Sequence, residues 1–169
     1  MSDYITFRAC IPADLPFIEA VYASSREVEM ALVPWTEVEK ANFLQYQCHA
    51  QLAHYQAHYP GAEHLIILKD TQPIGRLYLH HTAQEIRLMD VTLLPDYRRQ
   101  GIGSHIVRDL LREGDQTNCP VTLHVEVINP DAFRLYERLG FTAVTQRGVH
   151  IFMERLPQPA DVSSPEEVP

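Results

Sequence analysis

The feature that most constrains the fold is a change of pattern near residue 95, where an apolar run gives way to a loop and then to helical spacing. The run ends at Leu94, and the loop from Pro95 to Gly103 carries two arginines and two glycines. Beyond the loop, apolar residues recur at helical spacing, at Ile106, Val107, Leu110 and Leu111. A strand that leads through a glycine loop into a helix is typical of α/β folds.

The remaining chain alternates between strand-like and helix-like segments. Strands are expected at 4–8, 64–68, 74–80, 85–94, 120–127, 141–146 and 149–154, and helices at 12–30, 37–59, 103–112 and 130–139. Thr36 and Glu39 fit a capping box that starts the long second helix. Its expected buried face consists of Val38, Phe43, Tyr46, Leu52 and Tyr55. Early hairpins and a later βαβ crossover predict a mixed, mostly antiparallel sheet of about seven strands with helices on both faces.

Length and composition favour one domain. The 169 residues suit a single domain at residues 1–156, followed by a Pro-, Ser- and Glu-rich tail at 157–169 that we expect to be disordered. No apolar run reaches the ~18 residues of a membrane span, and the N-terminus does not resemble a secretory signal. A cytoplasmic location is therefore expected.

Charge and metal-ligating residues narrow the functional classes. The formal net charge of −8 disfavours nucleic-acid binding and suits a cationic partner such as an amine. The three cysteines match no disulfide or metal motif and are interpreted as reduced thiols. His54 and His58 lie four residues apart on a predicted helix, but no third ligand is indicated, so no metal is expected.

The loop at residues 98–103 has the features of an anion site. The first N–H groups of a helix have no intrahelical partner and lie at the positive end of its dipole. Gly101 and Gly103 would let a phosphate or pyrophosphate approach those amides, and Arg98 and Arg99 would add charge-assisted hydrogen bonds. The alternative is a tight strand-to-helix turn with solvated arginines, because short glycine motifs are weak signals.

Two stretches resemble motifs of the GNAT superfamily of N-acetyltransferases. Arg98, Gly101 and Gly103 match its motif A, [Gln or Arg]-x-x-Gly-x-[Gly or Ala]. The second stretch resembles motif B through Asn129, Ala132, Leu135, Tyr136, Leu139, Gly140 and Phe141. The motifs occur in the expected order, with the expected elements between them. The resemblance extends over about residues 4–156.

This resemblance implies a single GNAT domain that binds acetyl-CoA as a co-substrate. The loop amides would hold the pyrophosphate, the strand around Val91 and Leu93 would bond the pantetheine arm, and Asn129 would hold the arm or shape its cleft. Tyr136 would lie near the sulfur. The implied cofactor-binding residues are Val91, Leu93, Arg98, Arg99, Gln100, Gly101, Ile102, Gly103, Ser104, Asn129 and Tyr136.

Transfer of an acetyl group to an amine needs particular groups. Tyr136 could protonate or hydrogen-bond the leaving sulfur, although a phenol there could equally pack its ring with its hydroxyl in water. The resemblance implies that the Leu93 amide is the oxyanion donor. His124 and Glu126 share one strand face and are the candidate general bases. Asp90 and Glu85 on the neighbouring strand are further candidates, and a solvated strand residue is the alternative for each of the four. A dedicated base is not obligatory, since the substrate amine can lose its proton to water.

The acceptor amine belongs to a small molecule or to a protein, and the sequence does not separate the two. Glu27, Glu29 and Trp35 lie at a helix junction that often walls the acceptor site in the family, where they could bind an ammonium group. Surface charge and a packing aromatic are the alternative. Transfer of a longer acyl group and a non-catalytic acyl-CoA-binding or sensing domain are the rival functions. Family members commonly form homodimers, but no interface is identified.

Overall fold

The computed structural model describes residues 4–159 and confirms the mixed α/β class, with seven mostly antiparallel strands among the described residues. The chain forms two compact units, each of which is described by itself. The first runs to His81 and resumes at Leu88–Gly103, and the second contains Thr82–Arg87 and the chain from Ser104 onward. The domain limits expected from the sequence, residues 1–156, stay a prediction.

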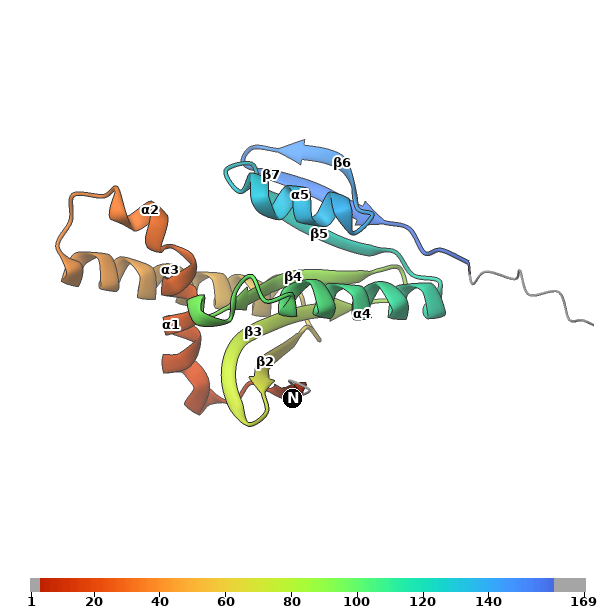
Figure 1. The fold of residues 1–169 in the computed structure, drawn as a ribbon. Coiled ribbons are helices and arrows are strands. Elements are labelled where there is room, and N and C mark those ends of the chain that lie inside the picture. Colours follow the sequence, from red (N-terminus) through yellow and green to blue (C-terminus); the bar gives the residue numbers. More distant parts are fainter. Residues whose placement is uncertain (1–3, 160–169) are drawn as a thin grey trace, which may run out of the picture. The chain divides into compact units, whose positions relative to one another are not determined.

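The first unit is built on four strands in the order β1-β2-β3-β4 (Figure 1). They are β1 (Ile5–Ala9), β2 (Glu63–Lys69), β3 (Gln72–His81) and β4 (Ile86–Leu93), whose first two residues belong to the second unit. Antiparallel pairing sets Phe7 opposite Ile67 and Ile66 opposite Arg76. The predicted antiparallel hairpin between residues 64–68 and 74–80 is therefore confirmed.

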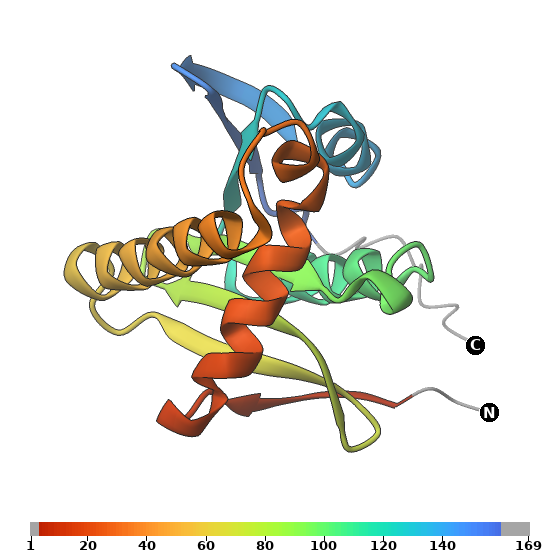
Figure 2. The ribbon, with the colours of Figure 1, turned by 90° about the vertical axis from the view of Figure 1, so that its left-hand side faces the viewer.

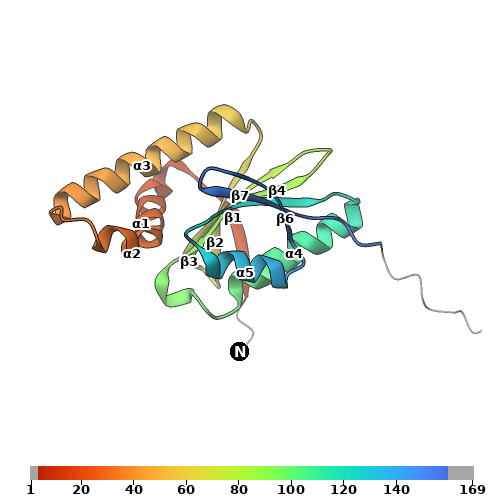
Figure 3. The same ribbon diagram turned by 90° about the horizontal axis from the view of Figure 1, so that it is seen from above.

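Helices α1 (Leu15–Ser25) and α3 (Glu37–His58) cross each other in this unit (Figures 2 and 3). A 3-10 turn, η1 (Pro12–Asp14), precedes α1, and the short α2 (Glu27–Ala31) follows it. Ile18 and Tyr22 of α1, Cys48 of α3 and Ile66 of β2 form one buried cluster. This cluster joins the helices to the strands.

The single helix expected at residues 12–30 is broken at Arg26, which leaves helical geometry with φ −112° and ψ 5°. The two serines before it explain the break. Ser24 Oγ donates to Val21 O at 2.7 Å and Ser25 Oγ donates to Tyr22 O at 2.6 Å. Side-chain bonds of this kind compete with the backbone ladder and favour helix ends.

The start of α3 agrees with the prediction, and its expected buried face is correct only in part, since Leu52 packs against the buried cluster but two of the five residues are exposed. Glu39 N donates to Thr36 Oγ1 at 3.3 Å and Thr36 N donates to Glu39 Oε2 at 2.8 Å, which completes the capping box. Val38 and Tyr46 are 70% and 73% exposed, whereas Cys48 is fully buried. The apolar residues of α3 are irregularly spaced, and the small Cys48 thiol takes the place where α1 packs.

A buried charge lies between these helices and the strands. Arg76 on β3 is 2% exposed, and its guanidinium donates to Asp90 on β4 and to Gln51 on α3. It also lies 5.9 Å from the centre of the Tyr22 ring. Burial alone would lower the pKa of Arg76, but the Asp90 carboxylate outweighs it and the pKa is raised. Thr92 Oγ1 donates to the other Asp90 oxygen at 2.9 Å, which fixes the carboxylate.

The second unit contains α4 (Ile102–Thr117), whose first two residues belong to the first unit, together with β5 (Val121–Glu126), α5 (Pro130–Arg138), β6 (Thr142–Arg147) and β7 (His150–Arg155). The strand order is β5-β7-β6, with antiparallel pairs, and α5 runs alongside β5 (Figure 1). Of the tail predicted to be disordered, Gln158 is described and its N–H donates to Asp115 Oδ1 at 2.7 Å. Residues 160–169 lie outside the described part of the chain.

At Gly75, the backbone of β3 lies close to the end of β4. A Cβ added at Gly75 would clash with Thr92 O and lie 3.0 Å from Leu93 Cδ2. Because one of these atoms belongs to the backbone, a side-chain rotation cannot relieve the overlap. The glycine therefore sets where the end of β4 lies.

We expect Gly75→Ala to lower the free energy of unfolding by about 1–3 kcal/mol, since the added methyl group must displace β4. Urea denaturation followed by circular dichroism measures the change. Gly103→Ala is the matched control, because no heavy atom lies within 4 Å of its added Cβ. Equal stability of the two variants would contradict the packing role of Gly75.

Candidate functional site

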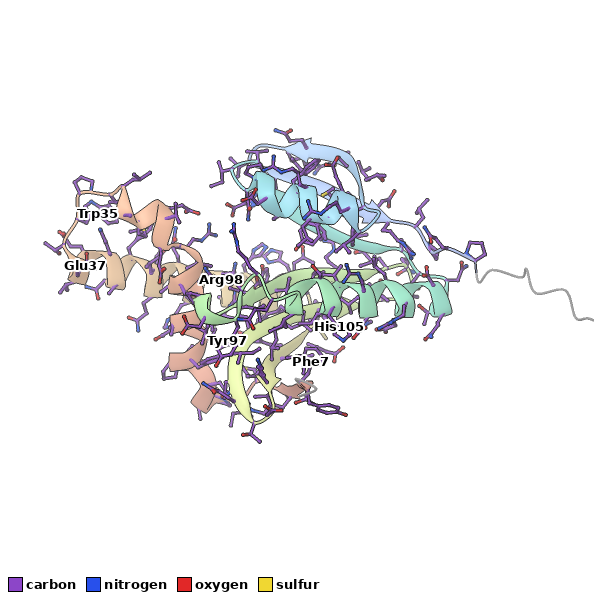
Figure 4. The ribbon with its side chains drawn as sticks, in the orientation of Figure 1. Phe7, Trp35, Glu37, Tyr97, Arg98 and His105 are labelled. Carbon is purple, nitrogen blue, oxygen red and sulfur yellow. The ribbon has the colours of Figure 1, made fainter. Side chains whose placement is uncertain are left out.

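The loop between β4 and α4 is shaped by its own sequence. After Leu93, Pro95–Tyr97 form a 3-10 turn with the proline in its first position, where a missing N–H costs nothing. Arg99 and Gly101 then adopt left-handed backbone angles, with φ +57° and +79°, before α4 begins at Ile102. Figure 4 shows Tyr97 and Arg98 at this turn. The loop thus brings the chain directly into the first turn of α4.

The Arg98 side chain is engaged with protein atoms. Its Nε donates to Leu93 O at 2.8 Å, and its Nη2 donates to Ser24 Oγ at 3.0 Å and to Ser24 O at 3.1 Å. Ser24 lies in the last turn of α1, where carbonyls lack helical partners and a cation is favoured. Arg98 therefore ties the end of β4 to the end of α1. Sequence reasoning missed Ser24, because no local signal joins it to a residue 74 positions away.

The Gln100 side chain is also used inside the loop, where Nε2 donates to Asp96 O at 2.7 Å. Arg99 is exposed. Of the two arginines expected to contact phosphate, Arg98 thus has most of its donors on protein acceptors, and Arg99 projects from the surface. Both roles stay predictions, and the geometry favours the loop backbone over the Arg98 guanidinium as the anion-binding element.

The two glycines of the loop fit a bound anion. No heavy atom lies within 4 Å of a Cβ added at Gly101 or at Gly103. Gly101 is required by its left-handed backbone, but Gly103 has no such angle and no close neighbour that demands a glycine. Open space at Gly103, beside the N–H groups of the first turn of α4, leaves room for an anion where helix amides favour one. Ile102 and Ser104 flank it in that turn.

The end of β4 presents backbone donors away from β3. Leu94 N donates to Ile74 O at 2.8 Å, so this amide faces β3. Successive amides of a strand point to opposite sides, which directs the N–H groups of Leu93 and Val91 to the other edge of β4. This geometry fits the expected backbone bonds to an extended pantetheine arm.

In the second unit, β5 carries the candidate bases. His124 is exposed, and its ring centre lies 5.1 Å from that of Phe152 on β7. The pKa of His124 is lowered, first by partial burial of the ring and then by the positive charge of Arg87. Glu126 lies two residues further along β5 and is half-buried. Alternation sets both side chains on one face of the strand.

Helix α5 carries the two motif residues of this unit. Asn129 Oδ1 accepts the Ala132 N–H at 3.1 Å and caps the helix, so part of this side chain serves the fold. Tyr136 is half-buried, and its ring stands edge-on to Phe141 with the ring centres 5.6 Å apart. The ring of Tyr136 therefore packs, while its role in catalysis stays a prediction.

The residues proposed from the sequence for the acceptor lie between α1 and α3. Glu27 is exposed, and Glu29 forms an ion pair with Arg26 at 3.2 Å, which partly neutralises it. Trp35 is 44% exposed, and its ring meets that of Phe43 edge-on at 5.2 Å. Figure 4 shows Trp35 at the corner between α2 and α3. Trp35 is thus packed against Phe43 and still partly accessible to solvent.

The two histidines that lie four residues apart on α3 pack against each other. The rings of His54 and His58 stack at 4.2 Å, and His58 Nδ1 donates to His54 O at 3.0 Å. Within residues 4–159, no group of three or more histidine, cysteine or acidic side chains is arranged to hold a metal ion. No helix in that same range is long and apolar enough to cross a membrane.

Comparisons with known proteins give one consistent result. The profile of the acetyltransferase (GNAT) family matches residues 25–141. N-alpha-acetyltransferase 30 of Xenopus laevis is 44% identical over 46 residues, 27% of this chain and 17% of that protein. The [Ribosomal protein bS18]-alanine N-acetyltransferase of Escherichia coli is 37% identical over 67 residues, 37% of this chain and 43% of that protein. The chain therefore matches less than half the length of these curated relatives.

The fold has close counterparts among solved structures. The PaiA N-acetyltransferase of Thermoplasma acidophilum, in complex with coenzyme A, superposes with a TM-score of 0.67 at 19% identity, covering 90% of this chain and 99% of that one. The spermidine N-acetyltransferase of Vibrio cholerae, in complex with CoA and spermine, gives 0.59 at 19% identity, with 90% and 95% covered. At these identities the likeness concerns the fold.

We expect Arg98→Gln to destabilise the protein by about 1–2 kcal/mol in the absence of any ligand, because it removes hydrogen bonds to Leu93 and Ser24. Urea denaturation measures this. Arg99→Gln is the control and should change stability by less than about 0.5 kcal/mol, as is usual for an exposed side chain. If Arg98→Gln is as stable as the parent protein, these hydrogen bonds do not stabilise the fold, and Arg98 serves only as a candidate anion ligand.

Proposed function

The chain belongs to the acetyltransferase (GNAT) family, and on that premise we propose that it transfers an acetyl group from acetyl-CoA to an amine. The observation that carries the proposal is the loop at Gly101 and Gly103, where open space meets the first turn of α4. A pyrophosphate is negatively charged and needs hydrogen-bond donors, and the helix amides beside that space provide donors at the positive end of the dipole. Acetyl-CoA, when bound, supplies an acetyl thioester that an amine can attack.

We assign the holding of acetyl-CoA mainly to backbone groups. The amides from Arg99 to Ser104 bind the pyrophosphate, and the edge of β4 at Val91 and Leu93 bonds the pantetheine arm. The direction of the Leu94 amide supports this role for β4. Arg98 keeps the end of β4 and the loop in place. Asn129 caps the start of α5 with its side-chain oxygen, and its side-chain NH2 group donates a hydrogen bond to the arm.

The chemical roles follow from what each group can donate or accept. The Leu93 N–H stabilises negative charge on the carbonyl oxygen, and the Tyr136 hydroxyl gives a proton or hydrogen bond to the leaving sulfur. His124 or Glu126 accepts the proton that the amine must lose. The lowered pKa of His124 keeps its imidazole neutral, and therefore able to accept a proton, over a wider range of pH.

The acceptor is proposed to be a cationic amine of a protein or of a small molecule. The names of the relatives include both, with ribosomal protein alanine in one and spermidine in the other. A net charge of −8 supports a cationic substrate. Trp35 offers an aromatic face, and Glu27 and Glu29 offer negative charge at the same corner.

Gly103→Glu should weaken acetyl-CoA binding by about 100-fold or more, because a carboxylate would face the pyrophosphate and like charges in contact cost several kcal/mol. Calorimetric titration measures the affinity, with CoA and a longer acyl-CoA as comparison ligands. Gly103→Ala is the control that keeps binding, since motif A accepts alanine at this position.

This position gives a cleaner test than Gly101, where any side chain also strains the left-handed backbone. If Gly103→Glu binds acetyl-CoA as well as the parent protein does, the phosphate-loop assignment is wrong. Binding without turnover of any amine in a panel would instead favour the acyl-CoA-sensing function.

Tyr136→Phe should lower kcat by about 100-fold, the usual contribution of a general acid, and should leave the affinity for acetyl-CoA nearly unchanged. Release of free thiol, followed with a panel of peptides and polyamines, measures the rate. Tyr46→Phe is a matched control, because that tyrosine is 73% exposed on α3. Equal rates for Tyr136→Phe and the parent would remove this hydroxyl from the mechanism.

A further inference from the structure

One face of the second unit carries an unusual set of side chains around His124. Thr122, His124 and Glu126 alternate along β5, and Glu154, Phe152 and His150 lie opposite them on β7. The residues between them on β5, Leu123 and Val125, are buried. The His124 face is therefore the polar face of this sheet, with one aromatic ring, Phe152, at its centre.

Arg87 adds a cation to this face. Its guanidinium carbon lies 6.0 Å from the centre of the Phe152 ring, and the His124 ring centre lies 5.1 Å from the same ring. Phe152 thus contacts both the cation and the imidazole. A guanidinium at this range over an aromatic ring is held by the negative face of the ring.

The position of Arg87 is fixed from its other side. Arg87 Nη2 forms an ion pair with Glu85 at 2.8 Å, and Thr122 Oγ1 donates to the second Glu85 oxygen at 2.8 Å. The side chains of Arg87 and Glu85 are each only 21% exposed. The series Thr122, Glu85, Arg87, Phe152 therefore anchors a positive charge near His124, where a freely moving surface arginine would be screened.

We propose that Arg87, oriented by Glu85 and Phe152, is a positioning residue that keeps the His124 imidazole neutral and thereby ready to accept the proton of the acceptor amine. This inference rests on the proposed acetyl transfer and names the group that prepares its base. In the step concerned, an N–H bond of the ammonium breaks, its electron pair stays on the amine nitrogen, and the proton binds the free imidazole nitrogen. His124 becomes an imidazolium, and the neutral amine can attack.

The charged groups around His124 have opposite effects on its pKa. Arg87 and His150 disfavour the imidazolium, and Glu85 favours it. Glu126 and Glu154 also lie on this face, and Arg147 lies opposite His150 on β6. Partial burial of the ring and the Arg87 charge prevail, so the pKa of His124 is lowered. Removal of the Arg87 charge should therefore raise it.

The test compares Arg87→Gln, which removes the charge, with Arg87→Lys, which keeps it. Two quantities are measured for each variant: the titration of the His124 ring by NMR, assigned with His124→Gln, and the pH profile of kcat/KM. The rate assays use acetyl-CoA with spermidine and with a peptide that has a free N-terminal alanine. Arg112→Gln is the control, because it removes an arginine of the same unit that is 67% exposed and pairs with Asp109.

In Arg87→Gln we expect the His124 titration and the acidic limb of kcat/KM to move together to higher pH, because the imidazolium is no longer repelled. Arg87→Lys should keep both near the parent values, and Arg112→Gln should change neither. Phe152→Leu, which keeps all charges but removes the ring that orients Arg87, should shift both in the same direction by a smaller amount.

Two results would overturn the inference. An unchanged His124 titration in Arg87→Gln would show that the cation does not act on the imidazole. A shifted titration with an unmoved acidic limb would show that His124 is not the base. Failure of the proposed function itself has a different signature, since the parent protein would then acetylate neither amine while its His124 titration remained measurable.

Discussion

The first unit depends on a positive charge in its interior. Arg76 is joined to β4 through Asp90 and to α3 through Gln51, and its guanidinium lies against the α1 ring of Tyr22. A buried ion pair adds little stability compared with apolar packing, but loss of either partner leaves an uncompensated charge and is costly. The pair therefore selects one arrangement of helices and strands. Asp90 directly precedes Val91, so this constraint also fixes the start of the strand segment proposed to bind the cofactor.

In the loop between β4 and α4, side chains and backbone have different roles. The side chains of Arg98 and Gln100 donate hydrogen bonds to protein atoms, namely to Leu93 and Ser24 from Arg98 and to Asp96 from Gln100. The amides of the following helical turn, beside two glycines with open space, are the groups proposed to bind the pyrophosphate. Backbone donors cannot change rotamer, so a site built from them is preorganised. The same logic holds in the second unit, where Glu85 and Phe152 hold Arg87 in a defined place.

Local signals in the sequence were sufficient for many elements. Thr36 and Glu39 determine the start of α3 because the cap involves residues three apart, and the glycine loop marks the start of α4 for a similar reason. Long-range contacts were beyond such reasoning. An arginine such as Arg76 is normally assigned to the surface, and only the fold brings Asp90 and Gln51 to it. The partner of Arg98 depends on the fold in the same way, so the motif identified the residue but not the use of its side chain.

The contact between Arg98 and Ser24 has a consequence for how such a protein can diversify. It fixes the end of α1, and the capping box at Thr36 fixes the start of α3. The segment from Glu27 to Trp35 connects these two fixed points, and it contains every residue proposed to contact the acceptor. A segment held at both ends can be exchanged for one of different length or chemistry while the loop proposed to bind the pyrophosphate stays where it is. On these proposed assignments, substrate range and cofactor use are separable traits of one small fold.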